Sequence, residues 1–272
     1  MKKKKECAYC KTHYDGLYDK CPNCGEPNPD KDSETTKNLS VYPLYKQILF
    51  FAVGLIGFQI AGFIISIILY LAYGEDGLNA GVLNFCCYAL TFAGLICVSI
   101  PKFDELFKSF KTFKPFGMGL AGFGALIAFS TFYSLFLAAV GYDGGENINE
   151  TSLVEIIKVY PVLSFVIFGV VGPICEELTY RVGLYTLARR LNRVAAYFIT
   201  VIVFALIHFN IPNPFDINVF INELINLPHY LFAGFVMTYL YDRYGLASSL
   251  TAHVTNNLYS IIMSLVGESL NV

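Results

Sequence analysis

The chain has 272 residues, of which 55% are hydrophobic and only 15% charged, and its formal net charge is −2. Soluble domains carry about 25% charged residues, whereas residues 1–46 hold 16 of the 40 charged side chains here. The rest of the chain therefore cannot form the charged surface of a soluble protein or the basic face of a nucleic-acid-binding protein, and it is too apolar to be disordered. This composition favours a polytopic membrane protein with a small polar N-terminal module.

The N-terminal module carries two cysteine pairs, each with two residues between its members, and ten residues separate the pairs. Four thiolates at this spacing can surround one ion as a tetrahedron, so the pattern predicts a structural zinc ribbon over residues 1–25. The alternative is a pair of disulfides, which the expected cytosolic position disfavours. A module of this size needs the metal in order to fold. The predicted ligands are Cys7, Cys10, Cys21 and Cys24.

A polar linker, residues 26–46, is predicted to join the ribbon to a hydrophobic region that covers residues 47–272. In this region, runs long enough or nearly long enough to cross a bilayer as helices follow one another. We therefore expect an all-α transmembrane bundle of seven or eight spans, with 219–227 as a partial eighth. The seven predicted spans are 48–73, 82–100, 117–140, 153–180, 194–209, 229–241 and 246–265.

The distribution of positive charge predicts the orientation of the bundle, because cytoplasmic loops are enriched in Lys and Arg. With the N-terminus in the cytosol and seven spans, eight of the ten Lys and Arg residues after Lys46 fall in the inner loops. We therefore expect a multi-pass protein of the cell membrane with a cytosolic N-terminus and an external C-terminus. Many Lys, Asn, Ile and Tyr residues are typical of a low-GC bacterium.

Polar side chains inside the predicted spans are the most informative residues, because a carboxylate at the bilayer centre costs at least about 2.5–3.5 kcal/mol. They fall on three helices and, at about 1.5 Å per residue, lie at comparable depth. Glu177 and Arg181 are four residues apart and can pair along one helix face. Cys175 is interpreted as a packing residue, because apolar surroundings disfavour a reactive thiolate. The set is Glu176, Glu177, Arg181, His208, His253, Asn256 and Asn257.

These residues form three motifs, namely EExxxR at 176–181, FxxxH at 204–208 and HxxxN at 253–257. In this order, each in an apolar span, they resemble the signature motifs of the CPBP family of intramembrane proteases, also called Abi or CAAX-protease-like. The resemblance covers about residues 150–265 and leaves the ribbon outside. It implies a polytopic helical endopeptidase that hydrolyses peptide bonds of membrane-associated or peptide substrates.

The resemblance also implies a role for each motif residue. Glu176 would be the general base that activates water, and His208 would share that water and move its proton. His253 and Asn257 would stabilise the oxyanion of the tetrahedral intermediate. This chemistry suits the residue types, because a carboxylate in a low-dielectric site is a competent base and an amide donor is strongest where water is scarce. The supporting residues would be Glu177, Arg181 and Phe204.

Three other interpretations remain open at this stage. Two histidines and a glutamate also make a catalytic zinc set, so a zinc-dependent metalloprotease with the same residues is the alternative to the favoured metal-free mechanism. A non-enzymatic membrane binding or immunity protein would use the polar cluster for docking. A proton-coupled carrier would also carry acidic residues and histidines in its spans, although no inverted repeat is evident.

The expected partners follow from this reading of the sequence. They are the lipid bilayer, a peptide or membrane-protein substrate, and a cytosolic protein recruited through the ribbon, whereas nucleic acid is not expected. Apolar spans contain no pattern that identifies an isoprenyl group. CAAX processing is therefore one option for the substrate, and maturation of a bacteriocin or a signal peptide is another.

Overall fold

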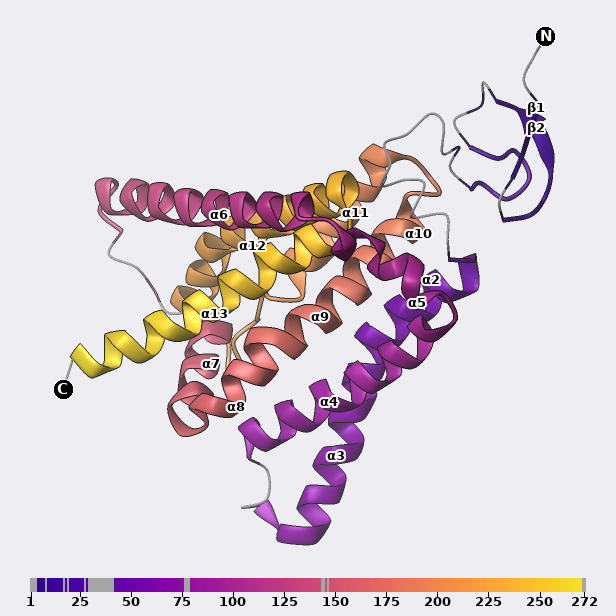
Figure 1. Cartoon of the computed structure of the whole chain (residues 1–272). Helices are drawn as coiled ribbons and strands as arrows, with labels where there is room; N and C mark the ends of the chain where they lie inside the picture. Colours follow the sequence, from indigo (N-terminus) through magenta and orange to yellow (C-terminus); the bar gives the residue numbers. More distant parts are fainter. Residues whose placement is uncertain are drawn as a thin grey trace.

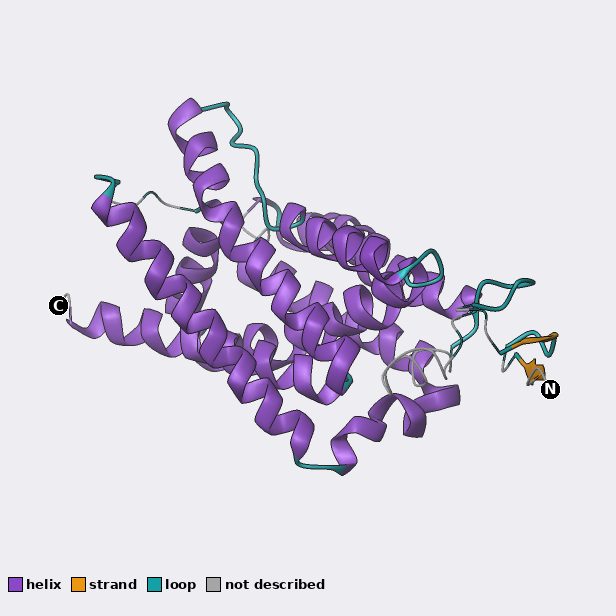
Figure 2. Ribbon diagram, turned by 90° about the horizontal axis from the view of Figure 1, so that it is seen from above, coloured by secondary structure: helices purple, strands orange, loops and turns teal. Residues whose placement is uncertain are grey.

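The computed structural model describes residues 4–7, 9–16, 18, 20–26, 28, 42–75, 79–142, 145 and 147–270, with only the backbone for the last three of these. Most of the predicted linker, from residue 29 to residue 41, lies outside the described residues, so its boundaries stay a prediction. Among the described residues, the regular elements are helices apart from one short two-stranded sheet, and loops join them (Figures 1 and 2). The predicted all-α bundle with a small N-terminal module is therefore confirmed.

The N-terminal module contains the two strands, β1 (Lys4–Glu6) and β2 (His13–Asp15). They are antiparallel, and Glu6 pairs with His13 at the end next to the first cysteine pair. The module lies beside one end of the helical bundle, next to α10 and α11 (Figure 1). This position brings the cysteines close to the chain that follows the first motif.

Three long apolar helices come first in the bundle. A continuous helix, Leu44–Tyr73, is followed by a second, Ala80–Lys111, and both are long and apolar enough to cross a membrane. The third is α6 (Lys114–Ala139), which meets the same criteria. The first comprises α2 (Leu44–Ala52), a π-helical segment (Val53–Gly57) and α3 (Phe58–Tyr73), and the second contains α4 (Ala80–Ser99), 3-10 turns at Ile100–Lys102 and Phe107–Lys111, and α5 (Phe103–Leu106).

The helix with the first motif is the most deeply packed of the candidate spans. It runs from Pro161 to Ala188 and is called the central helix below. Of its most apolar stretch, 56% is buried, against at most 28% for the other four candidate spans, so protein and not lipid surrounds it. Its segments are α8 (Pro161–Val166), the π-helical Ile167–Val171, α9 (Gly172–Glu176), the π-helical Glu177–Tyr185 and α10 (Thr186–Ala188).

The remaining helices surround the central helix. They are α7 (Ile148–Val159), α11 (Arg193–Leu206), α12 (Ile217–Tyr244) and α13 (Leu246–Leu270). The helix α13 packs against α6 and α12, and α12 also packs against α11. The elements that carry the three motifs, namely the central helix, α11 and α13, are therefore held together by α12.

Several predicted spans differ from the observed helices. The span at 153–180 breaks at Tyr160, because the proline that follows disfavours helical backbone at this residue. The spans at 229–241 and 219–227 are one helix, α12, with Pro228 inside it. The helix α11 has 14 residues, or about 21 Å, which is shorter than the hydrocarbon core. Among the described residues, five helices are long and apolar enough to cross a membrane.

Basic residues gather at the end of the bundle that faces the ribbon. Two contacts join the helix ends there: Lys46 donates to the carbonyl of Val98 at 2.9 Å, and the Ser109 hydroxyl accepts from the Ala247 backbone at 3.0 Å. The concentration of charge on one end agrees with a membrane protein whose loops differ in sign between the two sides. The basic residues of this end are Lys46, Lys102, Lys108, Lys111, Lys114, Arg189, Arg190, Arg193 and Arg243.

Two glycines allow the first helix to approach the central helix closely. A Cβ at Gly183 would lie 2.7 Å from the backbone nitrogen of Phe51, and a Cβ at Gly54 would lie 1.7 Å from the hydroxyl oxygen of Thr179. Any larger residue at either position would separate the helices, because protein interiors have no room for such a shift. This contact fixes the position of the central helix.

Candidate active site

The first motif lies where the central helix widens. Glu176 is the last residue of α9, and the π-helical turns Glu177–Tyr185 begin directly after it. Such wide turns are rare and often occur at functional sites. Glu177 and Arg181 are fully buried, whereas the side chain of Glu176 is 18% exposed. The two neighbouring carboxylates therefore have different environments.

Glu177 is the centre of a buried ionic cluster. Its Oε1 lies 3.2 Å from Nη1 of Arg181 and 2.9 Å from Nδ1 of His253. The guanidinium of Arg181 also donates to the carbonyl of Gly234 at 3.5 Å and lies 4.5 Å from the ring centre of Phe204. Buried charges need such partners. The cluster thus joins all three motifs, and it contains the pair that the spacing of Glu177 and Arg181 predicts.

Glu176 lies beside both motif histidines. Its Oε2 is 3.7 Å from Nε2 of His253 and 4.0 Å from Nε2 of His208. Direct hydrogen bonds need about 2.7–3.2 Å, so these distances suit a bridging water. Among the described residues this oxygen has no hydrogen-bond partner, although it is buried. The arrangement provides a place for a water molecule between one carboxylate and two imidazoles.

The hydrogen bonds of the two imidazoles assign their tautomers. Nδ1 of His208 lies 2.7 Å from the carbonyl oxygen of Phe204, which only accepts, so this nitrogen carries the proton. Nδ1 of His253 lies against the carboxylate of Glu177 and carries its proton for the same reason. In neutral imidazoles, both Nε2 atoms are then acceptors. Three acceptors therefore lie around one point, and a water there can donate to any two of them.

Asn257 lies one helical turn after His253 on α13. Its Nδ2 donates to the carbonyl of Phe168 at 3.0 Å, in the π-helical segment Ile167–Val171 of the central helix. An amide nitrogen carries two hydrogens, so one remains for another acceptor. Asn257 therefore connects α13 to the central helix and keeps a donor for a substrate.

The four predicted catalytic residues line one cavity, which has a volume of about 580 Å³. This is within the range of small-molecule sites and admits a segment of peptide. Its other walls come mainly from apolar side chains of α6, α7, α12 and α13. Cys175 is 3% exposed and is not among the lining residues, as expected for a packing residue. The predicted residues that line the cavity are Glu176, Phe204, His208, His253, Asn256 and Asn257.

Two residues of the cavity wall belong to no motif. The ring of Tyr230 stacks on the imidazole of His208, with centroids 4.7 Å apart and planes 16° from parallel. Its hydroxyl donates to Oδ1 of Asn147 at 3.2 Å. Tyr230 is one of 19 tyrosines, and Asn147 falls in a predicted outer loop, so no spacing in a single sequence distinguishes them. Only the packing of α12 against α11 and α7 brings them to the site.

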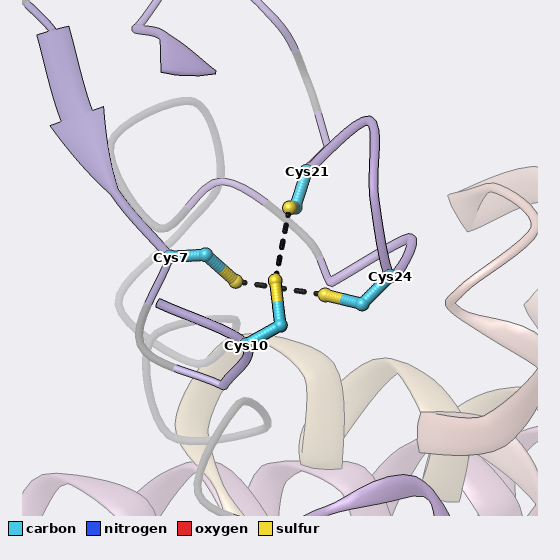
Figure 3. Close-up of side chains that lie close together, drawn as sticks. All are labelled: Cys7, Cys10, Cys21 and Cys24. Carbon is cyan, nitrogen blue, oxygen red and sulfur yellow. Dashed lines mark hydrogen bonds between the residues drawn. The ribbon is translucent and has the colours of Figure 1, made fainter. Parts of the chain in front are cut away.

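The four N-terminal cysteines form the candidate metal centre. Their sulfurs all lie within 4.8 Å of one another, and the pairs Cys7–Cys24 and Cys10–Cys21 are 3.6 Å apart (Figure 3). Ligands about 2.3 Å from a tetrahedral zinc are about 3.8 Å apart, whereas a disulfide is about 2.05 Å long. The donor set therefore fits a metal and contradicts the disulfide alternative.

The backbone of the ribbon is also typical of a metal knuckle. The amide of Lys11 donates to the carbonyl of Cys7, and that of Gly25 to the carbonyl of Cys21, and both residues have a positive φ. Hydrogen bonds with the side chain and backbone of Thr12 lower the pKa of Cys10 to about 5, whereas burial raises the pKa of Cys7 and of Cys24. Cys10 is thus the thiol of the cluster that most readily becomes the thiolate that binds metal.

The ribbon is fastened to the bundle by Arg190, two residues after the end of the central helix at Ala188. Its guanidinium pairs with Glu26 at 3.1 Å and donates to the carbonyl of Cys24 at 3.4 Å and to Oε1 of Gln47 at 2.7 Å. It also lies over the ring of Tyr9, 5.4 Å from its centre. Burial raises the pKa of Glu26 to about 7, and the charge of Arg190 opposes this rise.

The fold and the site define a class of protein: a helical, multi-pass membrane protein with a buried carboxylate and two histidines around one cavity. Residues 158–259 match the family model described as type II CAAX prenyl endopeptidase, Rce1-like. This segment contains all three motifs, so the resemblance predicted from them is confirmed.

Two curated proteins are similar to the chain over part of its length. The UPF0177 protein YvdC of Lactococcus lactis is 25% identical over 191 residues, which are 68% of this chain and 66% of the relative. A protein of Mycoplasma capricolum called uncharacterized is 25% identical over 168 residues, which are 57% of this chain and 46% of the relative. The chain thus spans less than two thirds of each relative. No solved structure matches it.

Proposed function

We propose that the protein is an intramembrane endopeptidase of the glutamate type, which hydrolyses membrane-associated or peptide substrates with water activated by Glu176. The observation that supports this most strongly is the position of Oε2 of Glu176, 3.7 and 4.0 Å from Nε2 of His253 and His208 in one cavity. A water among three acceptors is polarised toward the carboxylate and gains nucleophilicity.

In the proposed reaction, Glu176 takes a proton from the water as the water oxygen attacks the carbonyl carbon of the peptide bond. Negative charge then develops on the carbonyl oxygen. Glu176 passes the proton to Nε2 of His253, 3.7 Å away, and Glu177 stabilises the resulting imidazolium at Nδ1. The imidazolium and the second amide hydrogen of Asn257 both donate to the oxyanion. When the C–N bond breaks, the same proton returns through Glu176, with His208 beside the carboxylate as the shuttle, and is taken up by the leaving amine.

Arg181, Glu177 and Phe204 are positioning residues in this proposal. Arg181 neutralises Glu177 and rests on the ring of Phe204, so the carboxylate that faces His253 keeps its place. The backbone carbonyl of Phe204 fixes the tautomer of His208. The arrangement resembles other catalytic sites, where a third group orients the base.

The metal-free mechanism is preferred to a zinc mechanism with the same residues for a geometric reason. Ligands of one zinc ion lie about 3.3–3.8 Å from each other. Among the described residues, the cysteine set is the group of three or more potential ligands whose donor atoms all lie within 4.8 Å. Glu176, His208 and His253 are spread more widely than that set. We therefore assign zinc to the ribbon as a structural ion.

The same proposal includes an orientation and partners. We place the ribbon and the basic end of the bundle in the cytosol, and the C-terminus outside the cell, because positive loops face inward. The substrate is a peptide or a membrane protein, and the ribbon recruits a cytosolic protein partner. Farnesylated and unmodified substrates are both compatible with the apolar walls of the cavity.

The test is cleavage by the purified full-length protein in detergent. A library of quenched fluorescent peptides, some farnesylated at a C-terminal CAAX cysteine, provides the probes. Glu176→Gln should lower kcat by at least about a thousandfold, because it removes the base. Glu155→Gln is the matched control, since this exposed residue on α7 lies away from the cavity lining. Equal activity of wild type and Glu176→Gln would overturn the proposal.

A second arm separates the glutamate mechanism from the metalloprotease. A strong chelator is added to a variant from which the ribbon, residues 1–25, has been deleted. Loss of the ribbon's metal then cannot affect the result. Retained cleavage supports the metal-free mechanism. Loss of cleavage that added zinc restores would instead assign a catalytic metal to the two histidines and Glu176.

A further inference from the structure

Asn147 caps the first turn of α7 and lines the cavity, and it precedes all three motifs in the sequence. Its Oδ1 accepts from the backbone N–H of Glu150 at 3.1 Å and from the hydroxyl of Tyr230 at 3.2 Å. Both partners are donors, so the acceptor end of the amide must point toward them. The assignment of oxygen and nitrogen is therefore fixed by chemistry.

Among the residues that the structure describes, the other end of the same amide has no partner. Asn147 is 3% exposed and lines the cavity, and among the described residues its Nδ2 makes no hydrogen bond. A buried donor without a partner costs folding free energy. The start of a helix offers N–H donors, which a donor such as this nitrogen cannot bind, and the N–H of Ile148 is bound by Glu223 at 2.8 Å. The group is thus free to serve a ligand.

The position of this donor relates it to the proposed catalytic residues. Tyr230 connects the two: its hydroxyl binds Asn147, its ring stacks on His208, and Nε2 of His208 lies 4.0 Å from Oε2 of Glu176. A second amide, Asn149, donates to the same hydroxyl at 3.4 Å and holds it in place. An acceptor bound at Asn147 would therefore occupy the cavity together with the group attacked at Glu176.

We propose that Nδ2 of Asn147 is a substrate-binding group that donates a hydrogen bond to a backbone carbonyl of the peptide, beside the peptide bond that is cut. This inference rests on the proposed function and adds the recognition of main chain to it. Every residue of a peptide carries a main-chain carbonyl, so a donor at this position can hold the substrate without reading a side chain. The site therefore binds an extended peptide through its main chain and tolerates varied sequence.

The test measures peptide binding and not turnover, so that it is independent of the proposed chemistry. The protein carries Glu176→Gln, and the probe is a short C-terminally amidated peptide of alanine and leucine with a fluorescein label, whose side chains offer no acceptor; free fluorescein is measured as a control. Asn147→Asp keeps the helix cap and the bond from Tyr230 but removes the donor, and Asn147→Ser keeps the cap with a side chain too short to reach the cavity. Fluorescence anisotropy gives Kd, and thermal unfolding confirms that each variant is folded.

We expect Asn147→Asp and Asn147→Ser to weaken binding about tenfold, the value of one hydrogen bond. The matched control is Asn192→Asp, at an exposed cap that binds Ala195 at the start of α11, and it should leave Kd unchanged. Unchanged Kd in both folded Asn147 variants overturns the proposal. Binding of a short-chain phosphatidylcholine is measured in parallel, because its ester carbonyls are also acceptors. If the Asn147 variants weaken binding of this lipid but not of the peptide, the proposal is also overturned.

A cleavage assay distinguishes failure of this inference from failure of the proposed function. In protein with Glu176 intact, Asn147→Asp should raise KM about tenfold and change kcat less than about twofold. If the wild-type protein cleaves no peptide, the proposed peptidase function is overturned, and the binding assay still tests Asn147. If cleavage depends on Glu176 but Asn147→Asp leaves KM unchanged, only the role of Asn147 in binding the carbonyl is overturned.

Discussion

Glu176 and Glu177 are adjacent, yet the residues around them give them opposite properties. Glu177 has Arg181 and His253 within 3.2 Å and no exposed surface. Among the described residues, the ionic partners of Glu176 are two imidazole nitrogens at 3.7 and 4.0 Å, and its side chain keeps contact with the cavity. A buried carboxylate whose charge is balanced by a close cation stabilises structure, and one beside a cavity without such a cation is available for chemistry. We therefore expect Glu177 to contribute to stability and Glu176 to the reaction.

We predict that Glu177→Gln destabilises the folded protein by about 3–5 kcal/mol, because it leaves the buried Arg181 without its counter-charge. The measurement is thermal unfolding in detergent micelles, followed by far-UV circular dichroism. Glu176→Gln serves as the comparison and should unfold close to the wild-type temperature. Similar losses of stability in both variants would contradict this division.

The sequence predicts the residues of the site better than their surroundings. Intramembrane charge and helical spacing are enough to select Glu176, His208, His253 and Asn257, since each is expensive in lipid and needs a reason. Tyr230 and Asn147 carry no such signal, because a tyrosine in a span and an asparagine in a loop are ordinary. Their role arises from contacts between α7, α11 and α12, which no local pattern encodes.

At the scale of elements, one buried carboxylate holds the outer side of the cavity together. Glu223 on α12 is 1% exposed, and its two oxygens accept from the backbone N–H groups of Ile148 and Asn210 at 2.8 and 2.9 Å. It thereby joins the start of α7 to the chain that leaves α11. Tyr230 lies two turns further along the same helix.

We predict that Glu223→Gln lowers stability by about 1–3 kcal/mol, because the amide nitrogen that replaces one oxygen faces a backbone N–H and leaves it unpaired. Thermal unfolding again measures the change. Glu155→Gln, on the exposed face of α7, is the matched control and should have no effect. A wild-type melting temperature for Glu223→Gln would show that the carboxylate is not needed there.

The interface between ribbon and bundle depends on one guanidinium. Arg190→Ala removes the contacts with Glu26, Cys24 and Gln47 together, so we predict that the ribbon detaches. Hydrogen exchange of the backbone amides at residues 20–26 should become faster. Arg190→Lys should behave almost as badly, because an ammonium cannot make the forked contacts. Arg243→Ala, at the same end but 44% exposed, should leave exchange unchanged.

Elements could be predicted in type but less well in extent. Hydropathy alone locates the apolar helices. The spacing of the four cysteines predicts the geometry of the ribbon. Hydropathy does not show that the helix before Tyr160 is separate, or that α12 continues through Pro228, since both outcomes depend on how neighbouring helices satisfy the backbone. Hydropathy does not show the end of α11 either, which comes at Leu206, four residues before Asn210, whose backbone N–H binds Glu223.

At the scale of the whole molecule, positive charge and the ribbon share one end of the bundle. We predict that this end faces the cytosol. Protease added to inverted membrane vesicles should remove an epitope tag at the N-terminus, and protease added to intact spheroplasts should not. Removal in spheroplasts but not in vesicles would reverse the orientation.

Arg190 binds the cysteine module and also belongs to the chain that ends the central helix, so binding of the proposed metal and docking of the ribbon should be thermodynamically linked. Linkage is reciprocal. If a bound ion raises the equilibrium constant for docking by some factor, docking raises the affinity of the thiolates for that ion by the same factor. The intact protein should therefore retain its ion against a competing chelator at concentrations that strip Arg190→Ala. A cell that runs short of this metal would lose it first from molecules whose ribbon has come away from the bundle.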